Sequence, residues 1–385
     1  MTNPRGNFLE HFRQGQIIQH AIPRTITEGD NALYLSLTGE RYPLFCANSF
    51  AKQLGFSQTP INDFLLFHIA FGRTVHDISL NAVANLGYAE IKFLSSVYPG
   101  DTLTSHSEVI GVKENSNKTT GIVYVKSTTL NQNQEEVMSW KRWVMLPKLD
   151  PSAQIQEFLP EGIQPEVSVD DMSIPHSLTV KQFDFAMTGS NKIWDDYAVG
   201  EEINHDRGLT IDNATHTMAT HLYQNDAKLH FNAYSMKDTP FKQRLVYGGH
   251  VISLCRAISH EGLENALVTT AIHAGTHANP TFASDTIFAR TIVKSKDEVP
   301  SRPDLGVLRL RLIGLKNKTS HALKSIYQEG SNNKIYDPNV VLDLVFLWAT
   351  MSVGCHRDAT RSSPSLTGWR LQRKFLRRMT CHPRP

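Results

Sequence analysis

The chain has 385 residues, of which 40% are hydrophobic, 20% charged and 9% aromatic, and its formal net charge is +2. This length can bury a large core, in one large domain or in two, and the near-neutral charge argues against a broad nucleic-acid-binding surface. The sequence has no apolar run of about 18 residues and no N-terminal apolar segment of the signal-peptide type. We therefore expect a cytoplasmic protein with no membrane partner and no nucleic-acid partner.

The four cysteines are Cys46, Cys255, Cys355 and Cys381, and no two of them form a CxxC pair. This spacing argues against a structural zinc site and against a disulfide framework. A reducing cytosol fits the pattern best.

The chain repeats itself once. FLEHFRQGQII and WDDYAVGEEI share a pattern of aromatic, acidic and glycine residues that puts Gly15 and Gly200 185 positions apart. Further along, VYPGDTL and TFASDTI put Asp101 and Asp285 184 positions apart. A register held over so long a stretch predicts an internal duplication. At the same offset, Glu40 matches Asn225, and Phe45 matches His230.

Each half shows the same predicted elements in the same order. A short entry strand and an amphipathic helical stretch precede a longer apolar helix, INDFLLFHIAFGRTV in the first half and GGHVISLCRAISH in the second. Alternating β-branched runs follow, such as TLTSHSEVIGVKE, GIVYVKSTTL and MSWKRWVML. One long helix followed by an antiparallel meander predicts an α+β fold in each half, with the sheet wrapped around the helix.

Three composition changes give the predicted boundaries. Residues 6–150 form the N-terminal half, the Pro-rich residues 151–190 form a connector, and residues 191–351 form the C-terminal half. Residues 352–385 carry eight Lys/Arg against the single acid Asp358 and lack core periodicity. They predict a basic, disordered tail, although a frame change in the source sequence would look the same.

Several long blocks of the chain resemble a known family. They are DISLNAVANLGYAEIKFLSSVYPGDTL, LYQNDAKLHFN, LVYGGHVISL and YDPNVVLDL. The resemblance is to the MaoC-like double-hotdog enoyl-CoA hydratases and, within them, the mesaconyl-CoA (2-methylfumaryl-CoA) hydratases, over most of residues 6–350. It implies a tandem hotdog fold and reversible addition of water to an acyl-CoA substrate. It further implies that no metal or separate cofactor is needed. We also expect a homo-oligomer.

His230 is the predicted acid–base residue. The family motif is an acidic residue, a histidine five positions later, and a glycine-type pair about 18 residues further that opens the central helix. A lone histidine on a part-apolar stretch is ordinarily a core residue, and metal binding is a further alternative. However, the repeat places Phe45 at the equivalent position, so the fold has no structural need for imidazole there. Imidazole can take a proton from water and return it.

The partner of His230 is open between two neighbours. Asn225 occupies the acidic position of the motif but cannot accept a proton, so it would position the water by hydrogen bonding. Asp226 is ionisable and adjacent. We expect Tyr223–Phe231 to be helical, so that successive side chains point about 100° apart and only one of the two faces His230. The spacing of five favours Asn225.

Gly248 and Gly249 are expected to bind the thioester oxygen, because free N–H groups at a helix N-terminus stabilise negative charge. A mesaconyl-type substrate also carries a free carboxylate, which needs a cation or several hydrogen-bond donors when it is buried. The nearby candidates in the sequence are Tyr247, His250, Arg244 and Lys228.

Other readings remain open. His273 and His277 have a metal-like spacing of four, but Gly275 and the Asn279-Pro280 pair argue against a helix there, and no carboxylate completes the ligand set. No GxSxG motif supports a serine triad. The alternatives among enzymes are a hydratase for another short enoyl-CoA and a hotdog thioesterase. A thioesterase would need a carboxylate base near the helix, for which Asp63 is the candidate. A non-catalytic acyl-CoA-binding protein is the alternative outside the enzymes.

Overall fold

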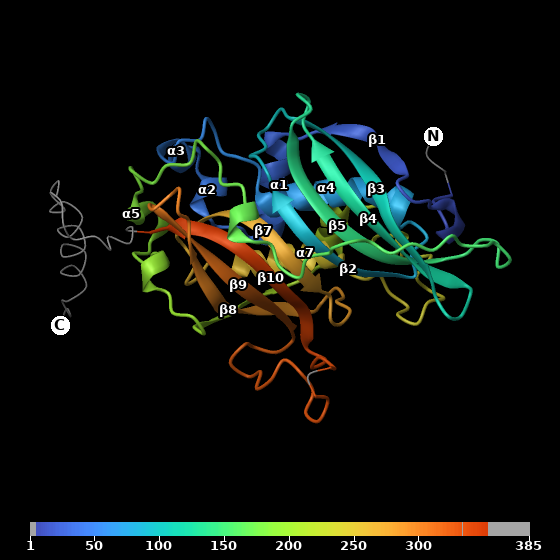
Figure 1. Ribbon diagram of the computed structural model, residues 1–385. Coiled ribbons are helices and arrows are strands. Elements are labelled where there is room, and N and C mark those ends of the chain that lie inside the picture. Colours follow the sequence, from blue (N-terminus) through green and yellow to red (C-terminus); the bar gives the residue numbers. More distant parts are fainter. Residues whose placement is uncertain (1–4, 333, 353–385) are drawn as a thin grey trace. The chain divides into compact units, whose positions relative to one another are not determined.

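The computed structural model describes residues 5–332 and 334–352 of the chain. The predicted tail, residues 352–385, therefore lies outside the described residues except for Ser352. Ten strands form one sheet in the order β1-β3-β4-β5-β2-β7-β10-β9-β8-β6, and every pair of neighbouring strands is antiparallel. Figure 1 shows the blue-to-teal half and the orange-to-red half of this sheet, with β2 and β7 between them.

The first half contains the elements that the sequence predicts, with several short helices added. Its helical elements are η1 (Leu9–His11), α1 (Glu28–Thr38), α2 (Pro43–Cys46), α3 (Asn48–Gln53) and α4 (Asp63–Ile78). Its strands are β1 (Ile17–Thr25), β2 (Ala84–Phe93), β3 (Thr102–Glu114), β4 (Thr120–Leu130) and β5 (Glu136–Pro147).

The second half follows the same plan. Its helical elements are η3 (Trp194–Asp196), α6 (Asn213–Leu222), η4 (Lys228–His230) and α7 (Gly248–Ile258). Its strands are β6 (Glu202–Thr210), β7 (Ala266–Thr276), β8 (Thr286–Glu298), β9 (Leu305–Lys316) and β10 (Val340–Met351). Between the halves lie only η2 (Val169–Asp171) and α5 (Phe185–Thr188) among the helical elements of the described chain.

The order of the sheet is a mirror image about the β2–β7 pair, where Ala89 pairs with Ala274 and Ile91 with Ile272. β1 begins at Ile17 and β6 at Glu202, 185 positions later. α4 begins at Asp63 and α7 at Gly248, at the same offset. The structure thus confirms the predicted α+β fold of two sheet-wrapped helices. The described residues nevertheless form one compact unit, and the domain boundaries stay predictions.

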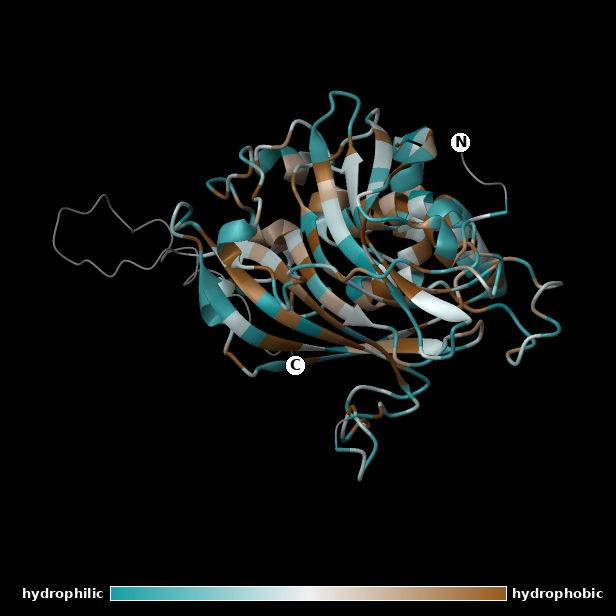
Figure 2. Cartoon of the chain, turned by 45° about the vertical axis from the view of Figure 1, so that its right-hand side comes forward, coloured by the Kyte–Doolittle hydropathy of each residue, from teal (hydrophilic) through white to brown (hydrophobic). Residues whose placement is uncertain are grey.

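The two long helices are apolar on nearly all sides, as a helix must be when a sheet wraps around it. Every residue of α7 from Gly249 to Ile258 is buried, and most of α4 is buried as well. Along the strands, apolar residues alternate with polar ones, as Figure 2 shows in brown and teal, which gives the sheet one face toward the helices. The start of α7 is consequently held deep in the fold.

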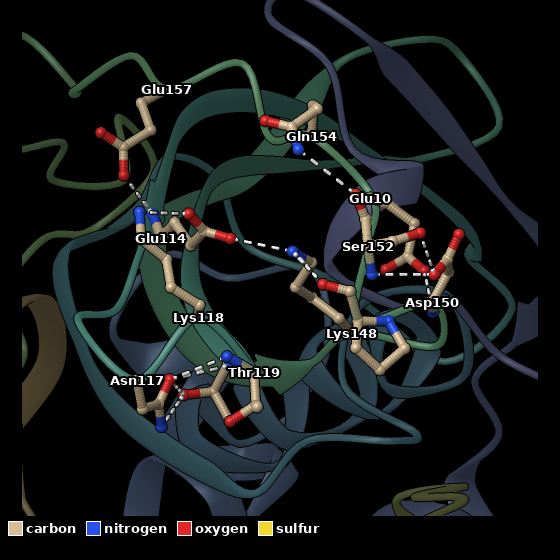
Figure 3. A network of polar contacts seen from close by, with 12 residues as sticks. Glu10, Glu114, Asn117, Lys118, Thr119, Lys148, Asp150, Ser152, Gln154 and Glu157 are labelled. Carbon is tan, nitrogen blue, oxygen red and sulfur yellow. Dashed lines mark hydrogen bonds and ion pairs between the residues drawn. The ribbon is translucent and has the colours of Figure 1, made fainter.

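The predicted connector begins with a set of polar contacts to the first half (Figure 3). Glu10 accepts hydrogen bonds from the N–H groups of Leu149 and Asp150, at 3.0 and 2.8 Å. Lys148 donates to Glu114 at 2.9 Å and to the carbonyl of Pro151 at 3.1 Å. These contacts hold the start of the connector against the ends of β3 and β5.

In residues 5–332 and 334–352, none of the helices has the length and apolar character that crossing a membrane requires.

Candidate active site

The segment that carries His230 is not the helix that the sequence predicts. α6 ends at Leu222, and Gln224 adopts a left-handed conformation with φ of +52°. The side-chain oxygen of Asn225 then accepts the N–H of Ala227 at 3.0 Å, and a short 3-10 turn reaches His230. A left-handed residue followed by such an Asx turn ends a helix, because both replace the helical hydrogen bonds. The expectation of helix over Tyr223–Phe231 was therefore wrong.

This turn opens onto a cavity of about 350 Å³ that brings together residues from both halves. Four of the predicted site residues line it: Asn225, His230, Tyr247 and Gly248. Four others, Asp226, Gly249, His250 and the first-half Asp63, are not part of its lining. The sequence thus places the cavity at the start of α7, as the family motif implies.

His230 is half-buried in the cavity wall and has a defined tautomer. Its Nδ1 lies 3.1 Å from the carbonyl oxygen of Leu245, which can only accept, so Nδ1 carries the proton. In the described part of the chain nothing hydrogen-bonds Nε2, which is left as the basic nitrogen. Desolvation by the surrounding protein lowers the pKa of His230 to about 4. The ring is therefore neutral and able to accept a proton throughout the neutral range.

Asn225 lies on the cavity and Asp226 does not. Asn225 is 5% exposed, and because its oxygen is held by Ala227, it presents the two N–H donors of its amide. The carboxylate of Asp226 is 59% exposed and lies 3.0 Å from Nδ1 of His76. Of the two partners that the sequence left open, only Asn225 lines the cavity together with His230. It can donate a hydrogen bond to water or substrate but cannot take a proton.

The N-terminus of α7 has no side-chain cap. Tyr247 is the N-cap residue, and its side chain offers no capping hydrogen bond. The N–H of His250 donates to the carbonyl of Tyr247 at 2.9 Å. Over the described residues, no acceptor is found for the N–H groups of Gly248 and Gly249. Free amides at the positive end of a helix dipole favour an oxyanion. The helix therefore presents an unused donor, the N–H of Gly248, at the cavity wall.

The two glycines have different surroundings. A Cβ at Gly248 would lie 2.6 Å from Cε1 of His277. Because glycine has no side chain, the His277 ring can pack against the start of the helix. A Cβ at Gly249 would lie 2.4 Å from Cε1 of Tyr247 and 2.6 Å from Nδ1 of His68, and Gly249 is buried. Gly249 thus serves packing, whereas Gly248 lies on the cavity.

The predicted carboxylate-binding residues are mostly placed elsewhere. Arg244 donates to Thr217 at 2.6 Å and to Asn213 at 2.9 Å, both on α6. The Nδ1 atom of His250 lies 3.3 Å from the hydroxyl of Tyr223 in the core, and Lys228 is exposed. Only Tyr247 lines the cavity. These positions share the turn or helix of the motif, but their side chains point to other faces of it.

Two cavity residues with ionisable side chains were missing from the predicted site, Arg142 and His277. Arg142 is on β5 in the run MSWKRWVML, where Trp140, Arg142, Val144 and Leu146 alternate toward the core. This period of two could have revealed an arginine on the inner face of a strand. The sequence pattern of His277, four residues after His273, suggests only metal binding. No group of three or more possible metal ligands occurs among residues 5–332 and 334–352.

His273 and Asp63 both have structural partners. Nδ1 of His273 accepts the N–H of Val167 at 2.7 Å, and its other ring nitrogen contacts Arg309. Asp63 accepts the N–H of Thr269 at 2.8 Å, and burial raises its pKa to about 7. Since Asp63 is absent from the cavity lining, the thioesterase alternative gains no support from this site.

Comparison with known proteins gives a consistent result. The family model described as mesaconyl-CoA hydratase matches residues 1–320. A curated β-methylmalyl-CoA dehydratase of Chloroflexus aurantiacus is 49% identical over 89% of this chain and 96% of its own length. A mesaconyl-CoA hydratase of Cereibacter sphaeroides is 44% identical over 91% of this chain and 99% of its own length.

The solved structures agree in fold. A MaoC domain dehydratase from Chloroflexus aurantiacus superposes with a TM-score of 0.84 at 46% identity, over 91% of this chain and 99% of that one. A Mycobacterium tuberculosis protein described as a double hotdog gives a TM-score of 0.70 at 22% identity, over 89% of this chain and 98% of that one, which bears on the fold alone. With its matching family model, its close relatives and its mirrored double-hotdog sheet, this chain belongs to the mesaconyl-CoA hydratase family.

Proposed function

We propose that this protein reversibly adds water to mesaconyl-CoA to form β-methylmalyl-CoA, using His230 as the single base. The observation that carries the proposal is one cavity lined by a neutral imidazole, the amide of Asn225 and the uncapped start of α7. The reactions named for the relatives from Chloroflexus aurantiacus and Cereibacter sphaeroides support the choice of substrate.

The chemistry follows from the donors and acceptors available. The amide of Asn225 donates to a lone pair of the water and holds it, while Nε2 of His230 accepts one of its protons. The water oxygen bonds to C3 as the double-bond electrons move toward the thioester. The resulting enolate oxygen is stabilised by the amide of Gly248 and the helix dipole. His230 then returns the proton to C2, so that its charge is restored at the end of each cycle.

The second half supplies the base in this scheme, and the first half supplies part of the cavity wall. Phe71, Val75 and Arg142 of the first half line the same cavity as His230. This fits the repeat, in which Phe45 occupies the position of His230 and cannot carry protons. The absence of a required cofactor, the homo-oligomer and the cytoplasmic location stay predictions.

The test is an ultraviolet assay that follows loss of the conjugated enoyl-thioester absorbance. We expect mesaconyl-CoA to be hydrated with a kcat/KM well above that for crotonyl-CoA, and the reverse reaction to proceed from β-methylmalyl-CoA. Acyl-CoA hydrolysis faster than hydration would favour the thioesterase instead. Binding of mesaconyl-CoA without any absorbance change would favour the non-catalytic alternative.

A further inference from the structure

Arg142 is a fully buried cation for which the protein itself provides almost no partner. Its side chain is 0% exposed, and no carboxylate in the described chain lies within ion-pair distance of it. Nη2 makes two long contacts of 3.4 Å, to the carbonyl of Thr74 and the hydroxyl of Ser79. Nε and Nη1 have no hydrogen-bond partner at all. A buried charge with unused donors is costly unless something else pairs with it.

The fold itself does not require an arginine at this position. Arg142 pairs with Val125 across β4 and β5, and Phe346 pairs with Leu310 across β9 and β10. Val125 and Leu310 are 185 positions apart, so Arg142 and Phe346 are equivalent in the two repeats. Phe346 is fully buried, and an apolar residue therefore serves the same place in the other half.

The cation lies in the wall of the cavity that contains the base. The guanidinium carbon is 4.4 Å from the centre of the Phe71 ring. The ring of Tyr247 is 6.4 Å from that of Phe71 and 5.4 Å from that of His230. Burial lowers the pKa of Arg142 to about 9, so the group is still charged at neutral pH. Arg142 and His230 thus line one cavity, and the ring of Tyr247 lies between the rings of Phe71 and His230 in the same lining.

We propose that Arg142 binds the free carboxylate of the substrate and selects dicarboxylic acyl-CoA thioesters over simple enoyl-CoAs. The inference rests on the proposed function, since it assigns the substrate's second acidic group. In mesaconyl-CoA that carboxylate is bonded to C3, the carbon that water attacks. Its cation must therefore lie in the same cavity as the base, and Arg142 and His230 line one cavity. Two nitrogens of the planar guanidinium, Nε and Nη1, have no partner in the described part of the protein and can donate to a carboxylate.

The experiment compares two ligands that cannot be hydrated and differ only at this group. 2-Methylsuccinyl-CoA carries the carboxylate, and 2-methylbutyryl-CoA has a methyl group in its place. Calorimetry should show that the wild-type protein binds the first at least about tenfold more tightly. Arg142→Met should raise the Kd of 2-methylsuccinyl-CoA about 100-fold. It should change the Kd of 2-methylbutyryl-CoA less than about threefold. Arg142→Lys, which keeps the charge but not the fork, should recover part of the loss.

A second buried arginine serves as the matched control. Arg256 is 1% exposed, also has an unpartnered Nε and Nη1, and lies over the rings of Tyr42 and Trp348 outside the cavity. Arg256→Met should leave the ratio of the two affinities unchanged. The assignment would be overturned if Arg142→Met weakened the binding of both ligands equally, or the binding of neither. A wild-type protein that does not prefer the carboxylate would overturn it as well.

The thermal stability of the unliganded protein is a further readout. If Arg142 is kept for the ligand, Arg142→Met removes an unpaired buried charge, and Tm should stay equal or rise. A fall of several degrees would instead indicate a structural role and count against the proposal. These measurements need no turnover. A failure of the wild-type protein to hydrate mesaconyl-CoA would therefore reject the proposed function. The two ligand affinities would still show whether Arg142 binds the carboxylate.

Discussion

The two repeats share the same turn but use it in opposite ways. In the first half, Gly39 is left-handed with φ of +70°, and Glu40 accepts the N–H of Tyr42 at 3.1 Å. In the second half, Gln224 is left-handed, and Asn225 accepts the N–H of Ala227 at 3.0 Å. These residues correspond at an offset of 185. The backbone geometry is therefore a property of the fold and cannot by itself account for activity.

The difference lies in what the turn leaves unused. The other oxygen of Glu40 accepts from Asn62, the N-cap of α4, whose own oxygen accepts the N–H of Phe64. Phe45 is buried at the position of His230. In the first half, therefore, the helix is capped and the base position is apolar. In the second half, the helix N-terminus and the imidazole are both free to bind a ligand. The two repeats therefore differ in which groups at the helix N-terminus and at the base position have no hydrogen-bond partner within the described protein.

The largest effect is expected from making the second repeat like the first at the base. His230→Phe should lower kcat for mesaconyl-CoA hydration about 10³-fold, because general-base catalysis contributes about 10²- to 10⁴-fold. The fold should survive, since Phe45 fills the equivalent place, and circular dichroism with a thermal melt checks this. A variant that folds and keeps more than a tenth of wild-type kcat would contradict the role of His230.

The next effect concerns the water-positioning amide. Asn225→Ala should lower kcat about 10- to 100-fold, since it removes the amide donors beside His230 and leaves the base in place. Asp226→Asn is the matched control and should change kcat less than about twofold, because that carboxylate faces solvent and His76. Steady-state kinetics of both variants decides the matter. A large loss in Asp226→Asn with a mild Asn225→Ala would reverse the two roles.

In the first repeat, removing a polar side chain at the start of the central helix should lower stability and leave kcat unchanged. Asn62→Ala removes the cap of α4 and the hydrogen bond to Glu40, and it should cost about 1–3 kcal/mol of unfolding free energy. Chemical denaturation measures this cost. kcat under conditions where the variant is folded should stay within about twofold of wild type. A selective loss of kcat would show that the first repeat takes part in the chemistry.

The smallest effect is in the pH profile, where the expected result is near constancy. Because desolvation lowers the pKa of His230 to about 4, the ring stays neutral, and so able to accept a proton, as pH falls from 8 to 5.5. kcat/KM should then fall less than about twofold over that range. If His230 had the usual pKa of about 6.5, kcat/KM would fall about tenfold by pH 5.5, because most of the ring would be protonated. A tenfold loss in the still-folded protein would show that His230 is not desolvated as described.

The family motif predicted residues in one region of the fold, the turn after α6 and the start of α7. Of these, His230, Asn225, Tyr247 and Gly248 line one cavity, and their roles stay predictions. The errors concern side-chain direction within that region. Arg244 and His250 are near in sequence but face α6 and the core, respectively. Periodicity predicts such directions only inside regular elements, and the left-handed Gln224 interrupts the helix at the decisive point.

The sequence by itself determined the duplication, the sheet-wrapped helices and the repeat that carries the imidazole, because these follow from local pattern and from the register of two copies. Only the tertiary structure decided that Asn225 rather than Asp226 faces the cavity, and that Arg142 of the first repeat lies in the same cavity as His230 of the second. Local sequence patterns predict neither of these features. The first depends on a backbone turn that departs from helical geometry, and the second on helices and strands far apart in sequence that pack together to form one core.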